Sequence, residues 1–277
     1  MGDLALVPPI PDAWHANQRD TQADYMAVVT DAIVNHPRSL QTDIGPSEVG
    51  TPCTRKLGHK LAGTPERSLP PNWKATIGTG VHLWLEEAFD RANLVWAAAN
   101  GNQGVERWLT ETRFTVGHHL DGTPLEGSCD LFDRLTRTVV DHKTVGPTQL
   151  KKYRASGAGN QYRTQAHLYG AGWVARGEAV EHVAIAFLPR NGDLDEAVWW
   201  TEPWDPQVAA QALQRLHGVE AALAMLGPAA ALAQLPMQDD YCSSCPFFRP
   251  GSTDPETGCP GHMPEAPTHT PALTLRY

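Results

Sequence analysis

Two aspartates and a lysine lie within one predicted hairpin in the middle of the chain. Asp141 and Lys143 are two residues apart on its second strand, so their side chains emerge on the same face. If the turn is centred between residues 135 and 136, Asp130 on the first strand faces Asp141. Facing side chains are about 4.5–5.5 Å apart at Cβ, and two carboxylates that close repel each other unless a cation or a proton lies between them.

This combination of side chains has a recognised chemical use. Carboxylates bind hard divalent cations such as Mg²⁺ and Mn²⁺, together with water and substrate phosphate. Such a cation makes hydroxide available near neutral pH and offsets charge on a phosphorus centre, and a nearby lysine can orient the attacking water or stabilise the developing anion. An ordinary hairpin with a surface Asp–Lys pair has the same short pattern, so the interpretation depends on the rest of the chain.

Further strands and helices are predicted around this hairpin. The longest helical pattern contains His82, and another contains Gln165 and Tyr169 at positions i and i+4, on one face. Helices are predicted at residues 23–34, 73–96, 161–176 and 206–226, and strands at 106–116, 125–132, 138–144, 181–188 and 197–202.

The densest group of basic residues is Lys151, Lys152, Arg154 and Arg163. Most groups of this kind are solvated surface, but beside a site that cleaves phosphodiesters they could contact a nucleic acid backbone. The net charge of −9 argues against broad nonspecific binding of nucleic acid, and it leaves room for a local basic groove.

Length and composition indicate one large globular domain with appendages. The chain has 277 residues, of which 41% are hydrophobic and 19% charged, as is ordinary for a globular protein. No apolar run is long enough to span a membrane, and the N-terminus lacks the basic region of a signal peptide. Five cysteines, an odd number, favour a reducing cytoplasm and metal binding over disulfides.

Three cysteines near the C-terminus form an incomplete soft metal site. Cys242 and Cys245 are separated by two residues, and Cys259 follows in the same loop-rich segment. A tetrahedral site of this kind needs four ligands. Cys53, far upstream, would complete four thiolates, which suits an iron–sulfur cluster or zinc. His262 would instead complete a local zinc site.

The order of these motifs resembles that of a known family. The motifs are Cys53 before an arginine-containing helix, Gly78-x-x-x-His82, Gly127-x-x-Asp130, Asp141-x-Lys143, Gln165-x-x-x-Tyr169 and the three closing cysteines. Together they resemble the PD-(D/E)xK nucleases of the RecB type. They most resemble the branch with a cysteine-bound cluster, which includes the CRISPR-associated Cas-four proteins, the AddB nuclease domain and phage-encoded exonucleases. The resemblance covers roughly residues 47–262.

The resemblance implies catalytic and metal-binding roles for the matching residues. Asp130, Asp141 and Lys143 would be catalytic. Mg²⁺ or Mn²⁺ would be bound by Asp130 and Asp141 together with His82 and the backbone carbonyl of His142. Asp141 stands where many members of the family have Glu, although Asp is also found there in the RecB type.

The resemblance also implies contacts to DNA and a structural cluster. Gln165 and Tyr169 would position DNA beside the metal, with Lys151, Lys152 and Arg163 as further contacts. A [4Fe-4S] cluster that fastens the two ends of the domain together would be held by Cys53, Cys242, Cys245 and Cys259. The gap between the last two of these is longer than the family pattern, and His262 is the alternative ligand.

The implied fold is α/β with a restriction-endonuclease-like core. A central mixed sheet would be flanked by helices on both sides, with the His82 helix packed against it, and the predicted order of elements agrees. Residues 1–40 would form an N-terminal arm and helix, and residues 41–262 the nuclease domain, closed by its cysteine-rich metal-binding segment. Residues 263–277 would be a disordered tail.

The implied function is that of a metal-dependent DNA exonuclease, which hydrolyses phosphodiesters from DNA ends in recombination, repair or degradation. It would act in the cytoplasm of a bacterium or a phage-infected bacterial cell, on DNA that has a free end or is single-stranded, with recombination proteins as further partners and no membrane. The alternative is a non-catalytic DNA-binding or recombination-partner module with a zinc-binding C-terminal segment. The set of His82, Asp130, Asp141 and Lys143 favours the enzyme, because a binding module has no need for all four.

Overall fold

The computed structural model describes residues 21–36, 43–101, 104–238 and 242–262. Its contacts divide the chain into two units, residues 1–42 with 71–73, and residues 43–70 with 74–277. The first unit contains helix α2 (Thr21–Val34), close to the helix predicted at 23–34. The predicted tail lies outside the described residues, as do the first twenty residues of the predicted arm. In the described part of the chain, no helix is both long enough and apolar enough to cross a membrane.

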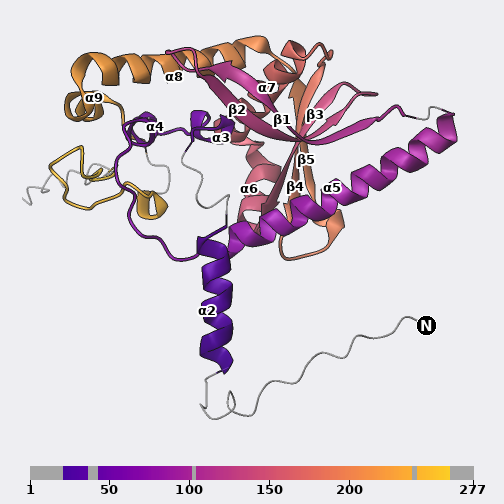
Figure 1. Cartoon of the computed structure of the whole chain (residues 1–277), viewed down its shortest axis with the longest axis horizontal. Coiled ribbons are helices and arrows are strands. Elements are labelled where there is room, and N and C mark those ends of the chain that lie inside the picture. The colour runs from indigo at the N-terminus through magenta and orange to yellow at the C-terminus, as the bar shows by residue number, and fades with distance from the viewer. Residues whose placement is uncertain (1–20, 37–42, 102–103, 239–241, 263–277) are drawn as a thin grey trace, which may run out of the picture. The chain divides into compact units, whose positions relative to one another are not determined.

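The second unit is built on a five-stranded mixed sheet (Figure 1). The order of the strands in the sheet follows the sequence. The strands are β1 (Trp108–His118), β2 (Pro124–Asp133), β3 (Thr138–Val145), β4 (His182–Pro189) and β5 (Val198–Pro203). β3 and β4 run parallel, and the other neighbours are antiparallel. The predicted α/β class with a central mixed sheet is therefore confirmed.

The β2–β3 hairpin has the register that the sequence predicts, but its ladder is short. Residues 131–133 pair with residues 138–140, so Asp130 and Asp141 occupy the next facing positions. The described ladder ends before them. Asp130 Oδ2 instead accepts a hydrogen bond from the backbone N–H of His142, at 2.6 Å. A hydrogen bond to this carboxylate therefore takes the place of the next backbone hydrogen bond between β2 and β3.

The helices of the second unit include the three long ones that the sequence predicts for it. They are α3 (Pro46–Val49), α4 (Thr54–Leu61), α5 (Trp73–Asn100), α6 (Pro147–Ser156), α7 (Gly159–Ala175), α8 (Pro206–Leu226) and α9 (Pro228–Gln234). The side chain of Asp205 caps α8 by accepting a hydrogen bond from the N–H of Gln207. Helix α6 was not predicted, because Leu150 is its only buried residue and the segment has no apolar periodicity.

Helices cover both faces of the sheet (Figure 1). On one face α7 packs against β1, β3 and β4, and α8 packs on α7. Trp173 of α7 stacks on Phe132 of β2 with 4.8 Å between ring centroids. On the other face Phe89 of α5 packs against Trp108, at 5.1 Å, and against the buried Val140 of β3. Aromatic burial of this kind contributes on the order of 2–3 kcal/mol per side chain, which fixes α5 and α7 against the sheet between them.

The segment that begins at Cys53 is held to the C-terminal segment by main-chain acceptors. Arg55 Nε donates to the carbonyl of Leu235 at 2.9 Å, across 180 residues of sequence. Arg67 Nε donates to the carbonyl of Cys245 at 3.1 Å. These guanidinium contacts bring the segment that begins at Cys53 next to the segment that contains the later cysteines.

Candidate active site

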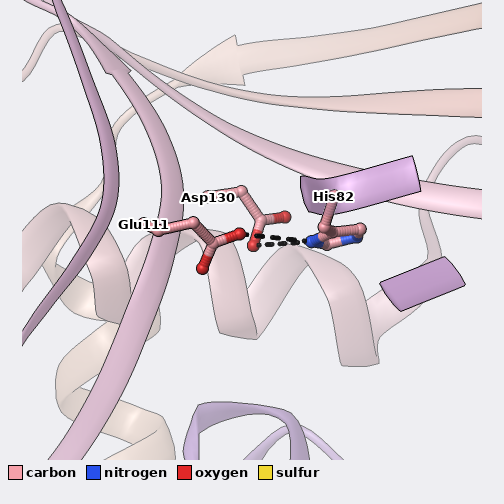
Figure 2. Close-up of side chains that lie close together, drawn as sticks. All are labelled: His82, Glu111 and Asp130. Carbon is pink, nitrogen blue, oxygen red and sulfur yellow. Dashed lines mark ion pairs between the residues drawn. The ribbon is translucent and has the colours of Figure 1, made fainter. Parts of the chain in front are cut away.

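Three side chains from separate elements converge beside the β2–β3 hairpin (Figure 2). His82 comes from α5, Glu111 from β1 and Asp130 from β2. His82 Nδ1 lies 3.4 Å from Asp130 Oδ1 and 3.5 Å from Glu111 Oε1, and the three ligand atoms lie within 4.8 Å of one another. One nitrogen and two carboxylate oxygens at this spacing can bind one divalent cation.

Glu111 belongs to this group although the sequence analysis did not identify it. Its two neighbours in β1 pair with Leu131 and Cys129, so Glu111 falls opposite Asp130. Its φ of +38° is uncommon for a residue with a Cβ, and such strain concentrates at functional sites. The turn at residues 119–122 would by itself place Glu111 opposite Leu131, and a register shift between Thr115 and Gly117 moves it opposite Asp130. No local signal in the sequence therefore identifies Glu111.

The second ring nitrogen of His82 faces the main chain. Nε2 lies 3.1 Å from the carbonyl oxygen of His142, the same carbonyl that the sequence predicts as a metal ligand. A hydrogen bond there would leave Nδ1 free to act as a ligand. Although burial opposes charge on the ring, contacts with Asp130 and Glu111 raise the pKa of His82 to about 10. A metal ion would therefore have to displace a proton from His82.

Asp141 and Lys143 share a face of β3, as predicted, and form an ion pair. Lys143 Nζ lies 2.6 Å from Asp141 Oδ2. Burial raises the pKa of Asp141 to about 6 against the opposing charge of Lys143, and Asp130 adds to the rise. Burial likewise opposes charge on Asp130, but His82 and Lys143 lower its pKa to about 2. The two carboxyls are thus driven apart in pKa, which is typical of functional sites.

The predicted pair Gln165 and Tyr169 is buried on one face of α7. Gln165 Nε2 donates to Tyr169 Oη at 3.1 Å. Burial raises the pKa of Tyr169, and the charges of Asp141 and Asp130 add to the rise, so its phenol lies near both carboxylates. Gly127 makes room for this ring and for Pro46, because a Cβ there would lie 2.6 Å from Pro46 Cγ and 2.9 Å from Tyr169 Cε1. The motif glycine therefore allows both α3 and the motif tyrosine to approach β2.

The predicted basic contacts are separated in the structure. Lys151 and Lys152 are both exposed on α6, but of these two Lys152 alone lines a large groove that also contains Thr144, the residue after Lys143. Arg163 lines the same groove, and its Nε pairs with Glu202 Oε1 at 2.5 Å. The groove therefore gathers part of the basic cluster and leaves Lys151 outside.

The candidate ligands of the soft metal site line a single pocket. They are Cys53, Cys242, Cys245, Cys259 and His262. All four thiols are free of disulfides. The backbone N–H of His262 donates to Cys242 Sγ at 3.4 Å, and those of Phe247 and Gly261 donate to Cys245 and Cys259. Burial raises the pKa of both these thiols, and Cys53 adds to the rise in each, so it lies near them.

Comparison with known proteins gives only distant similarities. No protein-family model matches the sequence, and no curated protein matches it. Among solved structures, that of SSO0001 has a TM-score of 0.45 and 14% identity, and covers 83% of this chain and 96% of that chain. An alkaline exonuclease (LHK-Exo) from Laribacter hongkongensis has a TM-score of 0.40 and 13% identity, over 69% of this chain and 94% of that chain. Its complex with dAMP has a TM-score of 0.38 and 14% identity over the same shares.

Proposed function

We propose that this protein is a metal-dependent DNA exonuclease. The observation that carries the proposal is the convergence of His82, Glu111 and Asp130 beside the Asp141–Lys143 ion pair. The order of sequence motifs, which resembles RecB-type nucleases, supports DNA as the substrate and a DNA end as the point of attack. The reaction would be hydrolysis, in which a water oxygen bonds to phosphorus, the bond from phosphorus to the leaving deoxyribose oxygen breaks, and that oxygen takes up a proton while the attacking water loses one.

The residues present fit Mg²⁺ or Mn²⁺. The donors are mostly hard carboxylate oxygens with one imidazole, a set that suits these ions. Among the described residues, Asp141 Oδ1 and His82 Nδ1 are buried atoms without a hydrogen-bond partner, as expected where a cation is the missing partner. When bound, the ion would lower the pKa of a water and offset charge on the phosphate.

The chain's own residues supply the remaining functions. Lys143 places its ammonium group beside Asp141, where it can stabilise negative charge that develops on the phosphate. Gln165 and Tyr169 would position the DNA. Because both side chains are buried, they would contact only a DNA strand that reaches the carboxylates. Gln165 Oε1 has no hydrogen-bond partner among the described residues and could accept a hydrogen bond from that strand.

We propose further that the four cysteines hold a [4Fe-4S] cluster. Their shared pocket and the N–H···S hydrogen bonds suit thiolate ligands, and the motif order favours iron–sulfur over zinc. Anaerobically purified protein should be brown and contain iron and sulfide, and Cys53→Ala should lose both. Colourless protein with one zinc and a tolerated Cys53→Ala would overturn the cluster while leaving the nuclease proposal intact.

The nuclease proposal is tested with end-labelled linear DNA and with the same DNA as a closed circle, in Mn²⁺. We expect the linear form to be degraded from its ends and the circle to resist. Lys143→Ala and Asp141→Ala should abolish cleavage, by at least about a hundredfold, with an unchanged circular dichroism spectrum. A folded variant with full activity would rule out this site. Binding by the wild type without any cleavage would favour the non-catalytic module.

A further inference from the structure

A large groove lies beside Lys143 on the second unit. Its volume is about 920 Å³. Its walls come from the loop between α3 and α4, the end of β3, α6, the first turns of α7 and one face of α8. Thr144 and Val145 line it directly after Lys143 in the sequence. The groove therefore adjoins the candidate active site.

The charge of this groove is opposite to that of the chain as a whole. The chain carries 31 acidic residues against 22 lysines and arginines. No acidic residue is among the described residues that line the groove. Its basic residues are Lys56, Lys74, Lys152, Arg163, Arg190 and Arg215. Low-dielectric walls that carry one sign of charge focus the field and favour an anionic ligand.

The basic side chains of the groove differ in whether they already interact with another group of the protein. Arg215 Nη2 donates to the carbonyls of Val49 and Thr51, at 2.6 Å each, and so holds the wall. Lys74, Lys152 and Arg190 form no ion pair with any residue that the structure describes. All three charges can be used by a ligand, and Lys152 and Arg190 are the two that lie beside α6.

Arg190 is placed where an anion would be needed. A Cβ on Gly146 would lie 2.9 Å from Arg190 Nη2, so the guanidinium sits against the N-cap of α6. The N-terminus of a helix carries partial positive charge. A phosphate between this guanidinium and the helix N-terminus would be attracted by both.

An aromatic ring joins the groove to the active site. Tyr162 lines the groove, and its ring centroid lies 5.1 Å from Lys143 Nζ. Tyr162 also packs near Phe187, at 6.0 Å between centroids. Aromatic side chains in a basic channel are platforms on which unpaired bases stack.

The size and the lining of the groove favour an unpaired strand. Its volume of about 920 Å³ lies in the range of about 300–1,000 Å³ that accommodates one small ligand, so it has room for a short unpaired segment. The ring of Tyr162 favours unpaired bases, because the faces of paired bases are already stacked within a duplex. We propose that this basic groove binds an unpaired DNA strand next to the scissile phosphodiester, with Lys152 and Arg190 on phosphates and Tyr162 against a base. The inference rests on the proposed function and adds the class of substrate.

The test is binding measured by fluorescence anisotropy in EDTA, so that no cleavage interferes. The probes are a labelled single-stranded oligonucleotide and the same sequence as a blunt duplex. The double variant Lys152→Ala/Arg190→Ala should weaken single-strand binding by at least about tenfold and lower the slope of log K against log salt by roughly 1.4, because each phosphate contact contributes about 0.7. Tyr162→Leu should weaken it by about tenfold. Lys151→Ala removes the same charge from α6 outside the groove lining and gives the reference for general charge loss.

The outcomes separate the groove from the nuclease proposal. If the double variant loses no more single-strand affinity than Lys151→Ala, or if duplex binding falls equally, the inference is overturned. Cleavage in Mn²⁺ is scored independently. If the wild type binds single strands through the groove and never cleaves them, the groove proposal stands and the nuclease proposal fails. If the groove variants cleave normally and bind as the wild type does, the nuclease proposal stands and the groove proposal fails. Circular dichroism melts confirm that the variants are folded.

Discussion

Replacing Asp141 with Asn should stabilise the metal-free protein and abolish its activity. The Asp141 side chain is 0% exposed, and burial raises its pKa from the ordinary value of 3.8 to about 6 against the charge of Lys143. A carboxyl with a higher pKa in the folded state than in the unfolded state favours folding only in its neutral form. Above pH 6 the fold must therefore hold a charge that water would solvate better.

The size of the effect follows from the two pKa values. At about 1.4 kcal/mol for each pH unit, the difference between 3.8 and about 6 corresponds to about 3 kcal/mol of unfolding free energy. The penalty is absent below pH 3.8, where Asp141 is neutral in both states, and it grows until pH 6. Asn has nearly the same size and no charge, and Lys143, whose side chain is 19% exposed, can extend toward water. We expect the variant to be more stable by up to about 3 kcal/mol at pH 7.

Urea denaturation in EDTA between pH 4 and pH 8 measures the difference. Asp133→Asn is the matched control, because Asp133 lies on the neighbouring strand and is also buried. Its carboxylate accepts two hydrogen bonds from Arg107, at 3.0 and 2.8 Å. These bonds lower the pKa of Asp133 although burial opposes them, so Asp133→Asn should lose about 2 kcal/mol at pH 7. A gain in unfolding free energy for Asp141→Asn and a loss for Asp133→Asn would distinguish a functional carboxylate from a structural one.

Mn²⁺ gives a second discriminating measurement. An ion that binds only the folded state stabilises it by RT ln(1 + [Mn²⁺]/Kd), so the wild type should gain stability on titration and Asp141→Asn much less. If Asp141→Asn is no more stable than the wild type at pH 7, or if the difference does not shrink toward pH 4, the electrostatic account of the site is refuted.

Three further predictions concern neighbouring parts of the site. His82→Ala should raise the Mn²⁺ concentration for half-maximal cleavage by about tenfold or more, while DNA binding in EDTA changes little; an unchanged metal dependence would make His82 structural. Gly127→Ala should cost about 1–3 kcal/mol in urea denaturation, because its Cβ would collide with Pro46 and Tyr169, whereas Gly78→Ala, which meets nothing within 4 Å, should gain about 0.5–1 kcal/mol. Tyr169→Phe should slow cleavage at unchanged Mn²⁺ affinity, and a loss of Mn²⁺ affinity would place Tyr169 in the metal site.

The part of the fold that local pattern controls could be predicted from the sequence. The register of the hairpin followed from one turn, because strand pairing has a period of two and a slip would exchange buried for exposed faces. Helix α8 followed from its cap and first-turn proline. Both features depend on residues close together in the chain, so no knowledge of tertiary packing was needed.

The parts of the site that could not be predicted from the sequence depend on contacts between distant segments. Glu111 reads as one more polar residue in a strand, and only its pairing opposite Asp130 shows its place. Lys151 and Lys152 are equivalent in sequence, and only the path of α6 along the groove separates them. Sequence spacing determines which side chains share a face, whereas the partner across that face is determined by the packing of α5, α6 and α7 on the sheet.

The proximity of Cys53 to the C-terminal segment leads to a final prediction, which concerns the stability of the whole domain. Arg55 and Arg67 join the two segments through the carbonyls of Leu235 and Cys245. A cluster held by Cys53 and the C-terminal cysteines would join the same segments, and because it would assemble on the folded site, its binding free energy would add to the stability of the whole domain. Cys53→Ala should therefore lower the protection of sheet amides and of C-terminal amides together in hydrogen exchange. Loss of protection confined to the C-terminal segment would show that the cluster stabilises that segment alone.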